Sequence, residues 1–272
     1  MTATAYYNEI DPFAAAWLQN LIDAGCIAPG VVDTRSIEEV TANDLKGFTQ
    51  CHFFAGIGVW SYALRCAGWP DSRPVWTGSC PCQPFSQSGK RRGFNDPRHL
   101  WPTWRQLIKE CAPYVIFGEQ VASKDGLTWF DVVQLDLEEA GYAVAVIDLC
   151  AAGIGAPHIR QRLFWVADAD NEQHPLATTA GSHEDISRQW NKNSEAIAGF
   201  SSNSGASPVN GVWRNADWLF CRDGKWRPVK PGVKPLVNGT PGRVGQLRAY
   251  GNAIVAPVAE TFIRAYMEAV TP

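Results

Sequence analysis

The sequence predicts an α/β fold in which a mixed sheet is covered by helices on both faces. Short runs rich in β-branched and aromatic residues alternate with segments of helical periodicity up to residue 167. At 272 residues, of which 46% are apolar and 19% charged, the chain is long enough for one large domain with a small satellite. From residue 168 the regular alternation stops, which indicates a second kind of region.

The first elements are short. Residues 3–10 predict a strand, and Pro12 suits the first turn of an amphipathic helix that ends near Gly25. Further strands are expected at residues 31–33, 51–54, 74–78 and 114–117, and helices at residues 36–45, 60–67, 100–110 and 131–140.

Three regions follow from this pattern. Residues 142–149 and 163–167 predict paired strands, and residues 255–269 a closing helix. Residues 168–210 are rich in small and polar residues without a period, which predicts long loops, and residues 211–241 alternate Trp, Arg, Gly and Pro. We therefore expect a core at 1–167, a small irregular module at 168–241 and a return to the core at 242–272.

Composition excludes some classes of protein. No apolar stretch is long enough to span a bilayer and the N-terminus lacks a signal pattern, so we expect a cytoplasmic protein that does not enter a membrane. Eight scattered cysteines indicate reduced thiols rather than a disulfide framework. Cys80 and Cys82 lack a second ligand pair at zinc spacing, so no metal is expected.

The net charge of −3 hides an uneven distribution. Residues 214–248 contain eight basic and two acidic side chains, and another basic group follows Cys82. These two regions could flank a phosphate backbone, although ordinary solvated surface charge is the better explanation of the charge pattern taken alone. The side chains that we assign to nucleic-acid binding are Ser86, Lys90, Arg91, Arg92, Arg98, Arg222, Lys225, Arg227 and Arg243.

Two motifs carry chemistry. Pro81-Cys82-Gln83-Pro84-Phe85-Ser86 places a cysteine in a loop after a strand, and the loop continues as a small, flexible, basic segment. Upstream, Phe54-Ala55-Gly56-Ile57-Gly58 follows another strand as a glycine turn, which lets a ligand approach the backbone. Together these motifs resemble the DNA cytosine-5 methyltransferase family.

The resemblance implies a Rossmann-like, S-adenosylmethionine-dependent methyltransferase sheet and attack by Cys82 on C6 of a flipped-out cytosine, with methylation at C5. Glu119 matches the family's acid, although Gln120 stands where Asn is usual. Arg160 and Arg162 match its two arginines, with His158 in place of Gln, and Arg162 is expected at the O2 atom of the base.

For the cofactor, the resemblance implies binding by the glycine turn, by Pro81, and by Asn252 and Ile254 of a C-terminal motif. The turn departs from the family pattern at His52 and Val59. The set expected from these segments is Phe54, Ala55, Gly56, Ile57, Gly58, Pro81, Asn252 and Ile254.

Two strands that normally separate the glycine turn from the cysteine are missing there. Glu9 and Ile10, and Asp33 and Thr34, resemble the ends of those strands moved to the N-terminus, with Glu9 on the ribose, Ile10 against adenine and Asp33 at the adenine amine. The alternative is an unrelated N-terminal extension on a truncated core. If the helix after the glycine strand keeps its face, its link to the cysteine strand becomes a disfavoured left-handed crossover.

The predicted function is therefore methyl transfer to a cytosine of double-stranded DNA by a monomer, with residues 168–241 reading the sequence. Two alternatives stay open: the same chemistry on an RNA cytosine, and a catalytically silent DNA-binding or regulatory relative.

Overall fold

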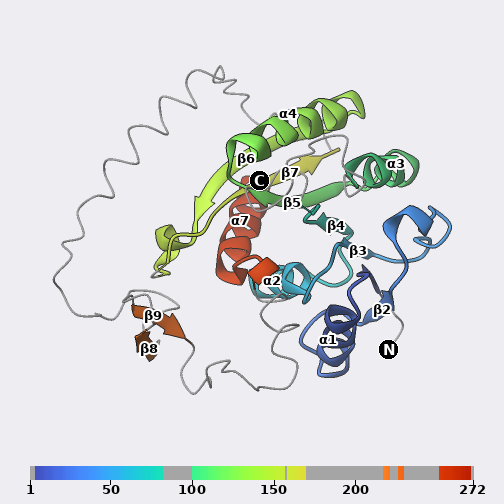
Figure 1. Cartoon of the computed structure of the whole chain (residues 1–272). Coiled ribbons are helices and arrows are strands. Elements are labelled where there is room, and N and C mark those ends of the chain that lie inside the picture. Colours follow the sequence, from blue (N-terminus) through green and yellow to red (C-terminus); the bar gives the residue numbers. More distant parts are fainter. Residues whose placement is uncertain are drawn as a thin grey trace.

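The fold is a seven-stranded mixed sheet with helices on both faces, as the sequence predicts (Figure 1). The computed structural model describes residues 4–81, 100–156, 158–169, 217–220, 226–229 and 251–270. The spatial order is β2-β1-β3-β4-β5-β7-β6, and β7 alone runs antiparallel to its neighbours. The strands are β1 (Ala5–Asn8), β2 (Gly30–Asp33), β3 (Gln50–Phe53), β4 (Val75–Gly78), β5 (Val115–Val121), β6 (Ala143–Cys150) and β7 (Gln161–Asp168).

Helices α1, α2 and α7 cover one face of this sheet, and η1, α3 and α4 cover the other. Alternating side chains of the strands separate the two cores. Val75 and Phe117 pack with α2 and α7, whereas Trp76 packs with α3 and α4. The elements are α1 (Pro12–Asp23), η1 (Ile37–Glu39), α2 (Val59–Ala67), α3 (Trp101–Cys111), α4 (Lys124–Glu139), η3 (Ala151–Ile154) and α7 (Ala256–Ala269).

A separate antiparallel hairpin consists of β8 (Asp217–Phe220) and β9 (Trp226–Val229). It falls inside the predicted recognition region, whose remaining residues lie outside the described ranges. The three predicted regions therefore stay predictions.

The N-terminal strands belong to the main sheet. Asn8 of β1 pairs in register with Phe53 of β3 on one side and Asp33 of β2 on the other, and all three strands are parallel. This is the spatial arrangement that strands displaced from behind the glycine turn require. Their displacement relative to the usual family order stays a prediction.

The connection β3–α2–β4 has the opposite hand to its neighbours. Helix α2 lies on the same face of the sheet as α1. Tyr7 of β1 packs on Leu18 of α1, and the Tyr7 hydroxyl lies 3.0 Å from Ser61 Oγ of α2. However, β1–α1–β2 runs toward one edge of the sheet and β3–α2–β4 toward the other. The unit β4–α3–β5 runs in the same direction as β3–α2–β4 but on the opposite face, so it shares the hand of β1–α1–β2. Because about 98% of such crossovers are right-handed, we assign β3–α2–β4 as the left-handed exception.

Three predicted boundaries were wrong. Residues 36–45 form no polar helix: a 3₁₀ turn covers only Ile37–Glu39, and Val40 is already extended. The side chain of Asp44 accepts hydrogen bonds from the backbone and hydroxyl of Thr41, which favours a turn over a continuing helix. Strand β5 runs four residues past Phe117, and α4 begins at Lys124 because Ser123 caps it through the N–H of Gly126.

Candidate active site

The predicted catalytic and cofactor residues that the structure describes lie at one edge of the sheet. The parallel strands β1, β3, β4 and β5 all end at this edge, and the antiparallel β7 begins there. Ligands of open α/β sheets bind outside the carboxyl ends of their strands. The edge is thus where a site is expected, and the topology brings Glu9, the glycine turn, Glu119 and Arg162 to it.

The glycine turn adopts a conformation that its sequence makes possible. Phe54, Gly56 and Gly58 have φ values of 51°, 56° and 77° in the left-handed region. A Cβ atom on Gly58 would approach the side chains of Leu18 and Ile27 at 3.0 and 3.2 Å, so Gly58 is required for packing as well. Among the described residues, a Cβ on Gly56 would meet only the carbonyl oxygen of Phe54, at 4.0 Å. No described side chain therefore fills the space beside Gly56.

Glu9 connects β1 to this turn. The backbone N–H of Gly56 donates to Glu9 Oε2 at 2.7 Å, and that of Asp11 donates to Oε1 at 2.8 Å. The adjoining Ile10 is 65% exposed, which is unusual for an isoleucine next to a strand end. A carboxylate, an exposed apolar side chain and a glycine turn are thus close together, as a nucleoside site requires.

The carboxylate of Asp33 accepts several hydrogen bonds. It accepts the hydroxyl of Tyr6 at 2.7 Å, and Arg35 donates to it from its backbone N–H, Nε and Nη2. The bonds from Arg35 lower the pKa of the Asp33 carboxyl to about 2, and Tyr6 adds to this. Asp33 is therefore ionised, and its predicted contact with an adenine amine would add a donor to an occupied carboxylate. The adjacent Thr34 is exposed.

His52 stands where the family often has an acidic residue, and it is part of the core. It stacks on Tyr7 with ring centroids 4.8 Å apart, and its Nδ1 lies 2.8 Å from Thr77 Oγ1. Burial lowers the pKa of His52 to about 3, so the ring is neutral. It supplies no charge to the turn.

Glu119 lies within β5, rather than after it, and is buried. Arg162 Nε lies 2.8 Å from Glu119 Oε1, which forms an ion pair between neighbouring antiparallel strands. Burial raises the pKa of the Glu119 carboxyl above its usual range, while Arg162, Ser79 and Arg160 oppose the shift. The group is thus an acid whose protonation depends on a few contacts, which suits general acid catalysis.

Gln120 points away from this pair. Its side-chain oxygen accepts the N–H of Val121 at 2.9 Å, and its buried Nε2 has no partner among the described residues. The residue that departs from the family motif therefore belongs to the other face of β5.

Arg160 makes a contact that the sequence did not predict. Its Nη2 donates to the carbonyl oxygens of Gly251 and Ala253, at 3.1 and 2.8 Å. These carbonyls flank Asn252, so Arg160 holds the C-terminal motif against the start of β7. Asn252 is exposed, and Ile254 is 8% exposed in the core with α2 and α7. Burial lowers the pKa of Arg160, with Arg162 adding to the effect.

Of the Cys-x-Cys segment, the structure describes Cys80. Cys80 is buried in the core and burial raises its pKa well above the usual range, which makes it a poor nucleophile. Pro81 is half-buried at the end of the described segment. Cys82, Ser86, Lys90, Arg91, Arg92, Arg98, Arg222, Lys225 and Arg243 lie outside the described residues, as does the side chain of Arg227.

Sequence reasoning missed Trp60 and Ser79. The indole N–H of Trp60 donates to Ser79 Oγ at 3.1 Å, and Ser79 is one of the groups that lower the pKa of Glu119. Ser79 precedes Cys82 by three residues, but a small hydroxyl residue after a strand gives no signal of a partner so distant in the sequence.

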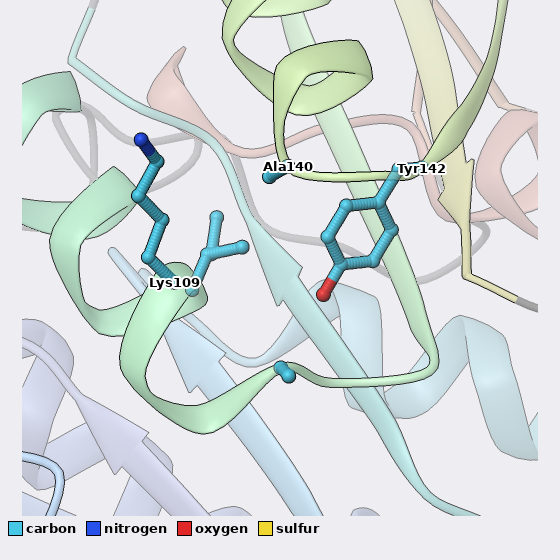
Figure 2. A pocket seen from close by; sticks show the side chains of 5 residues that line it. Lys109, Ala140 and Tyr142 are labelled. Atoms are coloured by element: carbon cyan, nitrogen blue, oxygen red, sulfur yellow. The ribbon is translucent and has the colours of Figure 1, made fainter.

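A cavity lies away from this edge. A cavity of about 320 Å³ between the ends of α3 and α4 is lined by Ile108, Lys109, Ala112, Ala140 and Tyr142 (Figure 2). The hydroxyl of Tyr142 donates to the carbonyl of Pro113 at 2.7 Å. These residues precede β5 and β6, so the cavity is at the amino edge of the sheet, opposite the candidate site.

The described ranges contain no cluster of three or more His, Cys, Asp or Glu side chains that could hold a metal ion. None of their helices is both long enough and apolar enough to cross a membrane.

Comparisons with known proteins relate this chain to one family. A family model described as C-5 cytosine-specific DNA methylase matches residues 70–210. The chain is 36% identical over 90 residues to the type II methyltransferase M.HhaI of Haemophilus parahaemolyticus, over 32% of this chain and 28% of that protein. It is 29% identical over 171 residues to M1.ScrFI of Lactococcus lactis subsp. cremoris, over 60% and 42% respectively.

A crystal structure of a Spodoptera frugiperda DNMT2 mutant is similar with a TM-score of 0.44 and 19% sequence identity, over 63% of this chain and 44% of that chain. The chain spans less than half the length of each of the two type II methyltransferases.

Proposed function

Because the chain belongs to the family of C-5 cytosine-specific DNA methylases, we propose that it transfers a methyl group from S-adenosylmethionine to C5 of a cytosine in double-stranded DNA. The buried ion pair of Glu119 and Arg162 carries this proposal. It lies at the carboxyl edge; Glu119 is on β5, the strand next to β4, and β4 ends four residues before Cys82.

Three side chains would act on the base. Cytosine C5 is a weak nucleophile, so the thiolate of Cys82 adds to C6 and makes C5 electron-rich. Glu119 donates a hydrogen bond to N3 as negative charge develops there, and Arg162 contacts O2. Once C5 has gained a methyl group, loss of the C5 proton and release of Cys82 from C6 restore the aromatic ring. The target base must leave the duplex to reach this buried pair.

The residues of the edge fit the cofactor. The space beside Gly56, the Glu9 carboxylate and the exposed Ile10 provide room for the methionine part, an acceptor for ribose hydroxyls and an apolar surface for adenine. S-Adenosylmethionine, when bound, supplies the methyl group that its sulfonium makes electrophilic. Asp33 and Thr34 would lie toward adenine, and Phe54, Ala55, Ile57, Gly58, Pro81, Asn252 and Ile254 would complete the surroundings.

The reordering of the cofactor strands is part of this proposal. β1 and β2 lie beside the glycine strand β3, where the family's ribose and adenine strands are expected. The family match begins at residue 70, after the glycine turn, as a displaced order would produce in a linear comparison. The position of β1 and β2 beside β3 favours displacement over an unrelated extension.

DNA would be held by the basic segment after Cys82 and by the basic part of the recognition region. A monomer acting on DNA in the cytoplasm, as a restriction–modification methyltransferase, is the setting we infer. The matched relatives bear the name type II methyltransferase, which supports that setting.

Trapping with 5-fluorocytosine tests the chemistry. Duplexes that contain this base in varied sequence contexts should form a covalent complex with the protein in the presence of S-adenosylmethionine, because the C5 fluorine cannot leave as a proton does. The Cys82→Ser variant should form none. A complex with tRNA but not with duplex DNA would assign the RNA activity, and no complex on any nucleic acid would favour a catalytically silent relative.

A further inference from the structure

Ser79 lies between the helix that follows the glycine turn and the acid of the site. Its Oγ accepts the indole N–H of Trp60 at 3.1 Å. Gly78 of β4 is in register with Gly118 of β5, so the residues that follow them, Ser79 and Glu119, are neighbours across the two strands, and Ser79 lowers the pKa of the Glu119 carboxyl as a hydrogen-bonding group. The three residues come from α2, from the segment after β4 and from β5.

The chemistry of these groups fixes the direction of both hydrogen bonds. An indole N–H can only donate, so Ser79 Oγ is the acceptor toward Trp60. A hydroxyl has a single hydrogen, and the bond from Trp60 leaves that hydrogen available for Glu119. Ser79 is therefore set as a donor to the carboxylate, whose ionised form it favours.

Trp60 is well placed to hold Ser79. It is 5% exposed, stacks on Phe117 with centroids 6.1 Å apart, and meets Phe164 edge-on at 6.0 Å. It is the second residue of α2, two positions after Gly58. The orientation of the Ser79 hydroxyl thus depends on the helix that begins at the glycine turn.

We propose that Ser79 is a positioning residue that, oriented by Trp60, donates its hydroxyl hydrogen to Glu119 and thereby links the glycine-turn helix to the catalytic acid. The other charged groups that face Glu119 among the described residues are Arg162, in direct contact, and Arg160. The catalytic meaning of this link rests on the proposed function; the hydrogen bonds themselves do not.

The test is the titration of Glu119 in the free protein, followed by NMR of ¹³C-labelled glutamate carboxyls and assigned with Glu119→Gln. Replacing Ser79 with Ala should raise the pKa of Glu119 by about one pH unit, because a donor to the charged form is lost. Trp60→Phe keeps an aromatic ring in the core but removes the N–H, and should raise the pKa by roughly half as much. Ser79→Thr, which keeps a hydroxyl, should restore the wild-type value.

The double variant separates a relay from two independent effects. In the Ser79→Ala background, Trp60→Phe should produce no further shift, because its influence passes through the hydroxyl. Trp69→Phe is a matched control: it removes a buried indole N–H that donates at 3.1 Å to the carbonyl of Arg73, outside the site. It should leave the Glu119 titration unchanged.

An unshifted Glu119 titration in Ser79→Ala, or additive shifts in the double variant, would overturn the proposal. Thermal unfolding of each variant identifies any that fail to fold. If Ser79→Ala is one of them, an unshifted Glu119 titration in Trp60→Phe overturns the proposal. The titration needs neither DNA nor cofactor, so its failure is distinguishable from a failure of the proposed methyl transfer, which is read by trapping through Cys82.

Discussion

The carboxylate of Glu9 accepts the backbone N–H of Gly56 at 2.7 Å and so joins the end of β1 to the glycine turn after β3. The two residues are 47 positions apart in the sequence, and they meet because β1 and β3 are neighbouring parallel strands. The Glu9 side chain thus supports the turn, and we propose that it also accepts the ribose hydroxyls of the cofactor. The N-terminal segment is in this way part of the candidate cofactor site.

Glu9→Ala should weaken binding of S-adenosylmethionine by about tenfold or more, because both a ribose acceptor and the support of the turn are lost. Calorimetry without DNA measures this directly. Asp23→Ala, which removes an exposed carboxylate at the end of α1 that pairs with Gln19, is the control and should bind normally. Unchanged affinity in both Glu9→Ala and Asp33→Ala would contradict the reordered cofactor site.

Replacing Arg160 and replacing Arg162 should impair different kinetic constants. Arg160→Ala removes two hydrogen bonds to the carbonyls around Asn252, so the KM for the cofactor should rise about tenfold, with a smaller loss in kcat. Arg162→Ala removes the ion-pair partner of Glu119 and should mainly lower kcat. Steady-state kinetics separates the two.

Arg264→Ala is the control for Arg160→Ala. Arg264, on α7, also donates to a backbone carbonyl, that of Cys66. It should leave both kinetic constants near wild type. If Arg160→Ala instead lowered kcat alone, Arg160 would act on the substrate directly, as the sequence first suggested.

The pair of Asp33 and Arg35 should make stability depend on pH. The pKa of Asp33 is lowered from 3.8 to about 2 in the folded state, so the pair stabilises the fold above the unfolded pKa, and this stability is lost as pH falls from about 4 to about 2. Asp33→Asn should therefore lower the free energy of unfolding at pH 7 by roughly 1 kcal/mol, after allowance for solvent screening.

Urea unfolding of wild type and Asp33→Asn over this pH range measures the difference. The gap between the two proteins should close toward pH 2. A gap that stays constant with pH would mean that the ion pair contributes nothing and that the variant is destabilised for another reason.

Gly118 of β5 allows Trp165 of β7 to lie against the strand backbone. A Cβ atom at Gly118 would lie 2.1 Å from two carbons of the indole, and the fully buried ring cannot move aside cheaply. Gly118→Ala should lower the free energy of unfolding by about 3 kcal/mol or more. Gly153→Ala, whose added Cβ would meet nothing within 4 Å, is the control and should change stability by less than about 0.5 kcal/mol.

The sequence predicted the features that depend on local patterns. The glycine turn and the first half of β5 were predicted because apolar runs and glycines act over a few residues. Residues 36–45 were wrongly predicted as a helix, because the hydrogen bonds of Thr41 and Asp44 compete with helical ones and composition does not reveal which prevail.

Long-range partners were harder to predict. Arg160 was expected at the substrate, but its guanidinium binds carbonyls 91 and 93 positions away. Ser79 was missed because only the packing of α2 against β5 brings Trp60 to it. The hand of β3–α2–β4, by contrast, followed from the order of strands once α2 was found on the face of α1.

Bisulfite sequencing of DNA from cells that express the protein tests the central claim most directly, because 5-methylcytosine resists the conversion that unmodified cytosine undergoes. In a host without cytosine-C5 methylation, the wild-type chain should protect cytosines in one short sequence context, and Cys82→Ser, expressed at the same level, should protect none. Complete conversion with the wild-type chain, or equal protection with Cys82→Ser, would contradict methylation through Cys82.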